Sequence, residues 1–389
     1  MRTLVALVLC LTSFPVWAQA NRPQTPVAPF PYRVVEVDVP VVDPETGEQS
    51  HTLGATITIP DAGAFGEGPF VGVVLMSGSG MQDRDSMIFE HRPFLVIADY
   101  LTRRGIAVLR YDDRVVGTST GSASGLTTQA LAHDGHSAIR FMQSFEGIDP
   151  QRVGVMGHSE GGGHVAWIGA RDESVAFLIS LAGVGVRGVE LMLDQTAAMF
   201  RDGGQSEAYI AESLKRRQAV FEAVIEGKDD DEIVELIALL NMHEYGVEEM
   251  NDGLRNVSRQ SLPAFAGTWT RSFVGYDPRE DWKKCSAPVL AMNGGKDFQV
   301  SPELNLGGIR GALEESGHSA YTIVEIAGLN HLFQHAQSGM LAEYATIEET
   351  FAPRRWRLSR RGSVRMSLSV DRAYPMTLGM PSPRRRSVI

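Results

Sequence analysis

Short apolar runs recur along the chain, and several of the longer segments between them carry apolar residues at three- and four-residue spacing. The runs lie at Phe70–Met76, Ile106–Arg110, Val153–Met156, Ala176–Leu181, Pro288–Met292 and Tyr321–Ile326. Pro93–Arg104 and Leu126–Phe145 lie between such runs and have the spacing of amphipathic helices. Because apolar strands that alternate with helices form a parallel sheet covered on both faces, the pattern predicts an α/β fold with a doubly wound, mostly parallel sheet.

The chain before this region has a different pattern. Tyr32–Val42 and Ser50–Pro60 are rich in β-branched residues and flank the turn-forming segment Pro44–Gly47. Two such runs around a turn predict an antiparallel hairpin at the start of the fold.

The segment 186–285 contains no strand-like run. Its apolar residues have helical spacing in Glu190–Arg201, Ser206–Glu226 and Asp230–Leu240. Strand-type sequence returns only at Pro288–Met292. We therefore expect a helical cap at 186–285, inserted between two parts of the α/β core at 21–185 and 286–353.

The first twenty residues have the pattern of an export signal. Arg2 supplies a positive charge, Leu4–Leu11 is apolar, and Ala18–Ala20 has small residues at the positions a signal peptidase requires. The apolar run is too short to span a bilayer. The pattern predicts a cleaved signal peptide at 1–20, a periplasmic or secreted protein, and no stable membrane insertion.

The formal net charge of −11 is unevenly distributed. Residues 354–389 contain ten arginines and one aspartate, so this tail carries +9 and the remainder of the chain −20. The tail has neither a hydrophobic period nor core-forming content, which predicts a basic, disordered segment. The acidic body argues against a nucleic-acid partner.

The strongest chemical motif is Gly157–Gly161, read Gly-His-Ser-Glu-Gly, which follows an apolar strand and runs into a small-residue helix. In that context Gly-x-Ser-x-Gly is typical of a nucleophile elbow, in which a strained turn exposes the serine hydroxyl. A second match, Gly117–Gly121, follows a charged segment and precedes no helix. The flanking elements therefore favour Ser159 over Ser119 as the nucleophile.

A serine nucleophile needs a base and a carboxylate that orients the base. The downstream histidines are His164, His243, His318, His331 and His335. His331 follows the last predicted strand, where a loop at the carboxyl edge of the sheet belongs; His335 is the alternative. Asp297 is the only carboxylate in the loop after Pro288–Met292, so we expect it to be the acid.

The developing negative charge needs two backbone N–H groups. One is expected from Glu160, directly after the nucleophile at a helix N-terminus. The other is expected from the glycine-rich loop after Phe70–Met76, with Ser79 as the choice and its neighbours as alternatives.

These motifs together resemble those of the α/β-hydrolase superfamily, in particular a group of bacterial serine esterases. The group carries Ser-Gly-Ser-Gly-x-Gln-Asp-Arg-Asp, Gly-His-Ser-Glu-Gly-Gly and Asn-His-Leu-Phe-Gln, which stand here at Ser77–Asp85, Gly157–Gly162 and Asn330–Gln334. The resemblance spans roughly residues 33–353 and implies the fold and the triad. It leaves the substrate open, because relatives include carboxylesterases, acyl-CoA thioesterases and serine peptidases.

The sequence departs from the resembling group in two places. Val115 stands in a loop where glycine is usual. Relatives also continue after Thr350–Pro353 into a final amphipathic helix, which the present tail cannot form. A divergent end or an altered reading frame would then leave apolar sheet surface uncovered.

We therefore expect an exported serine hydrolase that cleaves small-molecule carboxylic esters through an acyl-enzyme, with no cofactor and no metal. A serine peptidase or an acyl thioesterase would use the same groups. A non-catalytic binding protein on the same scaffold is the alternative of another class, and the ordered Ser159, Asp297 and His331 argue against it. The sequence predicts no oligomeric state.

Overall fold

The computed structural model describes residues 21–352, 355–358 and 364–367. The predicted signal peptide at 1–20 lies outside the described residues. Within the described part of the chain, no helix is both long enough and apolar enough to cross a membrane.

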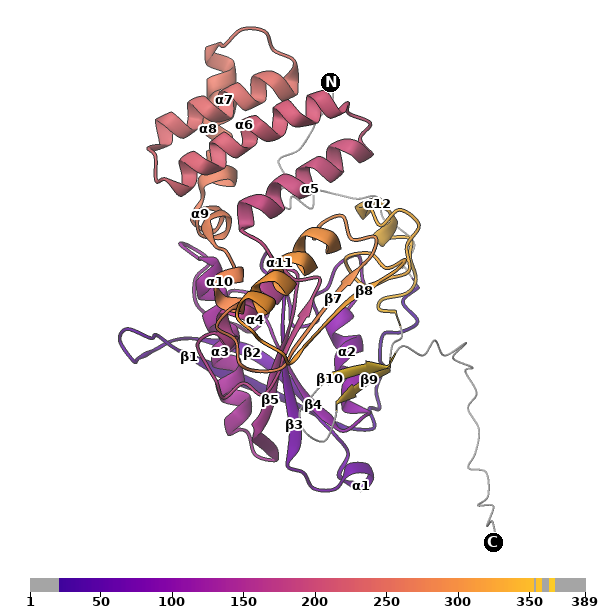
Figure 1. Ribbon diagram of the computed structural model, residues 1–389. Coiled ribbons are helices and arrows are strands. Elements are labelled where there is room, and N and C mark those ends of the chain that lie inside the picture. The colour runs from indigo at the N-terminus through magenta and orange to yellow at the C-terminus, as the bar shows by residue number, and fades with distance from the viewer. Residues whose placement is uncertain (1–20, 353–354, 359–363, 368–389) are drawn as a thin grey trace.

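An eight-stranded sheet with the strand order β1-β2-β4-β3-β5-β6-β7-β8 organises the molecule (Figure 1). In chain order the strands are β1 (Arg33–Val42), β2 (Gln49–Ile59), β3 (Phe70–Met76), β4 (Ile106–Tyr111), β5 (Ile148–His158), β6 (Leu178–Leu181), β7 (Val289–Gly294) and β8 (Tyr321–Ile326). The first two form the expected antiparallel hairpin, β2 also pairs antiparallel with β4, and the other neighbours are parallel. The predicted α/β fold with a mostly parallel sheet is confirmed.

Helices cover both faces of this sheet, so its central strands are buried throughout. Successive residues of β3 alternate between two apolar clusters: Val74 belongs to one, whereas Val73 and Leu75 belong to the other. Helix α2 (Pro93–Thr102) packs on the second cluster. Helices α3 (Thr128–Ser144), α4 (Glu160–Gly169) and α11 (Pro302–Glu315) pack on the first (Figure 1). Burial on both faces explains why β3 reads as a continuous apolar run.

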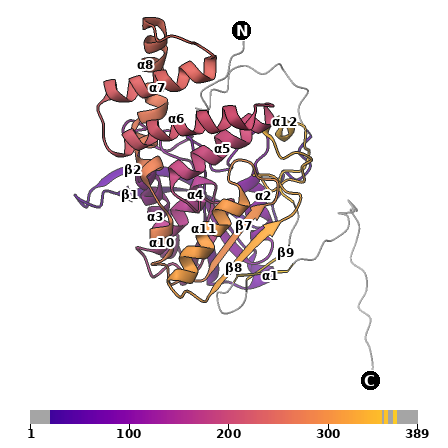
Figure 2. The ribbon, with the colours of Figure 1, turned by 45° about the horizontal axis from the view of Figure 1, so that its top comes forward.

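Six helices connect β6 to β7. They are α5 (Gly188–Asp202), α6 (Glu207–Ile225), α7 (Asp230–Tyr245), α8 (Asp252–Ala266), α9 (Thr268–Gly275) and α10 (Arg279–Trp282). The first five lie over the carboxyl ends of the strands, whereas α10 packs beside α4 and α11 (Figures 1 and 2). Ser206, Asp229 and Asn251 cap the N-termini of α6, α7 and α8, and the side chain of each accepts the backbone N–H of the residue three positions on. We call α5 to α9 the helical region; it has a core of its own that includes Phe221 and Ile237.

The structure describes two short segments of the basic tail at 354–389. Two short strands, β9 (Arg355–Leu358) and β10 (Val364–Ser367), pair antiparallel, with Val364 opposite Leu358 and Met366 opposite Trp356. Apolar and polar residues alternate along both strands, which is the strand period that the sequence analysis overlooked. The rest of the tail lies outside the described residues.

The expected uncovered sheet surface is also absent from β6 and β7. Ile179, Leu290 and Met292 are at most 2% exposed. They share the α2-side cluster with Phe333 and Phe351, so the segment after β8 contributes cover that a final helix would otherwise supply. Two short helices, α1 (Ala62–Phe65) and α12 (Leu341–Tyr344), complete the described elements.

Candidate functional site

Ser159 occupies the sharp turn between β5 and α4. Its backbone has φ +57° and ψ −123°, a conformation that non-glycine residues adopt only when the surroundings enforce it. The two flanking glycines are required by close approach: a Cβ on Gly157 would meet the backbone of Gly161, and a Cβ on Gly161 would meet the carbonyl oxygen of Ser77. The turn therefore has the geometry predicted for a nucleophile elbow.

Asp297 and His331 are in direct contact although they follow different strands. Nδ1 of His331 lies 2.8 Å from Oδ2 of Asp297, and both side chains are buried. The other oxygen of Asp297 accepts the backbone N–H groups of Gln299 and Val300, each at 2.9 Å. This arrangement fixes Nδ1 as the donor and leaves Nε2 of His331 as an acceptor.

The His331 loop is docked on the elbow by the residue before the serine. Nε2 of His158 donates to the carbonyl oxygen of His331 at 2.9 Å, and the two rings lie 4.6 Å apart. Burial, together with the neighbouring His331, lowers the pKa of His158 to about 3. The neutral His158 therefore links Ser159 to the loop of His331 without adding charge, a role that the sequence analysis missed.

The competing residues have other partners. Oγ of Ser119 donates to the carbonyl oxygen of Asp112 and accepts the N–H of Gly54, each at 2.8 Å. His335 is largely exposed and contacts Glu349 rather than Asp297. Ser119 thus links its own loop to Gly54. Asp297, the carboxylate predicted from the sequence, contacts His331 and not His335.

The glycine-rich loop after β3 lies against the elbow. A Cβ on Gly78 would come within 2.8 Å of Cβ of Ser159, so only glycine permits this approach. Ser79, predicted to supply an N–H group, follows directly. Its carbonyl oxygen accepts from the side chain of Gln82 at 2.9 Å. We call residues 77–82 the oxyanion loop.

Asp113, in the loop that follows β4, binds both ends of the oxyanion loop. Its carboxyl group accepts the hydroxyl of Ser77 at 3.0 and 3.1 Å and the backbone N–H of Gln82 at 2.9 Å. Burial raises the pKa of Asp113 to about 7, even though these hydrogen bonds act in the opposite direction. The adjacent Asp112–Asp113 pair at a strand end was the signal from which this anchor could have been found.

Arg84 and Asp85, at the charged end of the Ser77–Asp85 motif, bind residues of β4 and of the loops beside it. The guanidinium of Arg84 binds Asp112, with Nη2 at 2.7 Å from Oδ2. Asp85 pairs with the buried Arg110 and, at 2.9 Å, with Arg92. The Gln-Asp-Arg-Asp sequence therefore fixes the position of the oxyanion loop at its C-terminal end.

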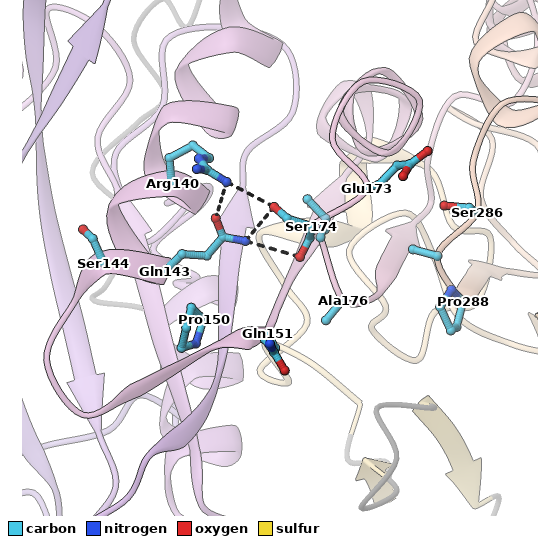
Figure 3. Close-up of a pocket in the computed structure, with 12 residues that line it drawn as sticks. Arg140, Gln143, Ser144, Pro150, Gln151, Glu173, Ser174, Ala176, Ser286 and Pro288 are labelled. Carbon is cyan, nitrogen blue, oxygen red and sulfur yellow. Dashed lines mark hydrogen bonds between the residues drawn. The ribbon is translucent and has the colours of Figure 1, made fainter.

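A surface groove lies away from these residues. It has a volume of about 710 Å³ and opens at the amino ends of β5, β6 and β7, near Pro150, Ala176 and Pro288 (Figure 3). Arg140, Gln143 and Ser174 hydrogen-bond to one another along its wall. Ligands of open α/β sheets bind at the carboxyl ends of the strands, so this groove is not the candidate site.

Comparison with known proteins agrees with the fold. A sequence model of the Alpha/beta hydrolase family matches residues 73–344. Esterase EstD of Thermotoga maritima is 28% identical over 301 residues, which make up 75% of this chain and 61% of EstD. The chain therefore spans less than two thirds of that relative's length.

Other matches are shorter or more distant. Quorum-quenching protein AidA of Acinetobacter baumannii is 37% identical over 84 residues, or 21% of this chain and 28% of AidA. The crystal structure of the α/β hydrolase GrgF from Penicillium sp. sh18 matches with a TM-score of 0.46 and 16% identity, covering 78% of this chain and 92% of GrgF. From the family match and the sheet topology together, this chain belongs to the alpha/beta hydrolase family.

Proposed function

We propose that this hydrolase is an exported serine esterase that cleaves small-molecule carboxylic esters. The observation that carries the proposal is the hydrogen bond between His331 and Asp297. His158 binds the carbonyl oxygen of His331 and thereby joins this pair to the strained turn at Ser159. A nucleophile elbow, an oriented histidine and a buried carboxylate are the groups that acyl transfer requires.

In the proposed reaction Oγ of Ser159 attacks the ester carbonyl carbon while Nε2 of His331 takes the hydroxyl proton. Asp297 stabilises the imidazolium that forms. The tetrahedral oxyanion is held by the backbone N–H groups of Ser79 and Glu160. Collapse expels the alcohol, which receives the proton from His331, and water then hydrolyses the acyl-enzyme by the same steps in reverse.

Two considerations support esters as the substrate class. The relative EstD is named an esterase. The helical region also covers the strand ends, where it is held by a buried apolar core that includes Val184, Val186, Val300 and Phe273. A helical cover over this edge is expected to shape an acyl pocket, which favours an acyl chain of small or medium length.

Turnover of a p-nitrophenyl acyl series by wild type and Ser159→Ala tests the proposal, with Ser119→Ala as the matched control. We expect Ser159→Ala to lower kcat/KM at least about 10³-fold and Ser119→Ala to retain turnover. A panel of peptide p-nitroanilides run in parallel tests the substrate class. Absence of ester turnover in the wild type, or faster cleavage of the peptides, would contradict the esterase proposal.

A further inference from the structure

The side chain of Glu160, unlike its backbone, has no assigned role in the mechanism above. It follows the nucleophile directly, yet its carboxylate is turned inward and the residue is only 2% exposed. An ionised carboxylate in such a position is costly unless several donors satisfy it.

Those donors come from residues far apart in the chain. Oγ1 of Thr128 donates to Oε1 of Glu160 at 2.5 Å, and Nε2 of His164 lies 3.4 Å from the same oxygen. Nε1 of Trp269 lies 3.0 and 3.2 Å from the two carboxylate oxygens. The side chain of Ser79 also acts on this carboxylate, in the direction that lowers its pKa.

These contacts keep the carboxylate ionised. Burial alone would raise the pKa of Glu160, but hydrogen bonds from His164, Thr128 and Ser79 outweigh it, and the pKa lies below its ordinary value. Both oxygens accept from protein donors, so the carboxylate is not free to bind a substrate ammonium group. Its contacts instead join parts of this chain to one another.

The parts that meet at Glu160 have distinct positions in the fold. Ser79 belongs to the oxyanion loop, and Thr128 begins α3. Trp269 belongs to α9 of the helical region, where its ring stacks on Phe273 with centroids 4.9 Å apart. Trp269 thus binds, from the cap side, the residue whose backbone N–H is proposed to hold the oxyanion.

We propose that Glu160 is a positioning residue that couples the helical region to the oxyanion site. Trp269 and Thr128 fix the carboxylate, and the placement of α9 thereby sets the backbone N–H of Glu160 that binds the oxyanion. The inference rests on the proposed function, because it concerns the geometry of that oxyanion site.

Trp269→Phe tests the coupling, because it removes the N–H donor and keeps an aromatic ring on Phe273. Trp167→Phe is the matched control: Trp167 lies on α4 but its ring contacts the guanidinium of Arg171, 4.4 Å from the centroid. The measurements are kcat and KM for a p-nitrophenyl ester and the Ki of a trifluoromethyl ketone, whose hydrate-like adduct mimics the tetrahedral oxyanion.

A hydrogen bond to a charged acceptor is worth about a tenfold effect or more when removed. We therefore expect Trp269→Phe to lower kcat roughly tenfold, to raise the ketone Ki by a similar factor, and to change KM little. Trp167→Phe should leave all three within about twofold. A rise in KM alone, or a ketone Ki that matches the control, would overturn the coupling.

Thr128→Val keeps the test valid if Trp269→Phe fails to fold, since it removes the hydroxyl that donates to Oε1 of Glu160 and preserves the size of the side chain. We expect it too to weaken ketone binding, and the double variant to lose less than the product of the two single effects. Independent, multiplicative losses would overturn the inference. If the wild type neither hydrolyses the esters nor binds the ketone, the proposed function itself is contradicted. If the wild type is active and the variants behave like it, only the coupling is contradicted.

Discussion

At the scale of single residues, the site depends on backbone conformations that the surroundings enforce. Ser159 at φ +57° lies between two glycines whose Cβ positions are occupied by neighbouring backbone. Strain of this kind is retained where it exposes a reactive group. The same positive φ at Val115 exposes nothing of the triad, so the two positions should respond to substitution in opposite ways.

Asp297→Asn should leave the fold intact and lower kcat about 10³- to 10⁴-fold. An amide in place of the carboxylate can present N–H to Nδ1 of His331, which would favour the wrong tautomer. Steady-state turnover of a p-nitrophenyl ester measures the effect. Asp38→Asn, on the exposed side of β1, is the control and should be neutral; a loss of less than tenfold in Asp297→Asn would argue against this orienting role.

Val115→Asn should raise the free energy of unfolding by about 1 kcal/mol. Val115 has φ +60° and is 52% exposed, so its β-branched side chain adds strain and little packing. Asparagine tolerates this region of the backbone map better. Urea denaturation measures the change; Val257→Asn, on an exposed position of α8, should stay within about 0.5 kcal/mol, and destabilisation at position 115 would contradict the strain argument.

At the scale of elements, the oxyanion loop is held at its ends and at its middle. Asp113 binds its ends through Ser77 and Gln82, and Gly78 lies close against Ser159. These contacts hold the loop in one position. A site that stabilises charge in the transition state needs hydrogen-bond donors that are fixed in this way before the reaction.

Asp113 should make stability depend on pH. Burial raises its folded-state pKa from 3.8 to about 7, so the protonated form is favoured in the native state. This contribution is fully present below pH 3.8 and is lost as pH rises toward and through about 7.

Asp113→Asn removes that titration and allows the prediction to be checked. The free energy of unfolding of the variant, relative to wild type, should increase between pH 4 and pH 8 by at least about 1.4 kcal/mol, the equivalent of one pKa unit. Urea titrations at several pH values measure this slope. A constant or decreasing difference would show that Asp113 is ionised throughout.

At the scale of the whole molecule, the segment before β1 binds the segment that follows β8. The guanidinium of Arg22 donates to the carbonyl oxygens of Phe89, Ala345 and Ile347, at 2.8, 3.0 and 2.7 Å. Gln24 accepts the N–H groups of Thr350 and Phe351 at 2.6 and 2.9 Å. This clamp secures the segment that follows the histidine loop.

Arg22→Ala should lower the free energy of unfolding by about 2 kcal/mol, because three carbonyl groups lose a charged donor at a half-buried position. Arg22→Lys should recover less than half of the loss, since an ammonium group cannot reproduce the planar fork. Thermal and urea unfolding measure both. Equal stability of the three proteins would mean that the clamp does not contribute.

The sequence allowed the sheet and the chemical groups to be predicted because both leave local signals. Apolar runs predicted β3 and β8 to the residue, and chain order together with position after predicted strands selected Asp297 and His331. The start of β5 was missed because Asp149 and Gln151 are polar and Pro150 lacks a backbone N–H, and α11 because Gly307, Gly308 and Gly311 weaken its helical signal.

The inward-facing role of Glu160 could not be predicted in the same way. Its partners Ser79, Thr128 and Trp269 are up to 109 residues away, and only the folded sheet and the helical region bring them together. Period-two alternation in Arg355–Leu358 was by contrast present in the sequence and was overlooked.

The most direct test of the account is to map the site of phosphonylation by a fluorophosphonate with intact-mass and peptide mass spectrometry. The account predicts one adduct, on the peptide that contains Ser159, with no labelling of Ser159→Ala and slow labelling of His331→Asn. An adduct on another serine, or ester turnover that persists in Ser159→Ala, would contradict it.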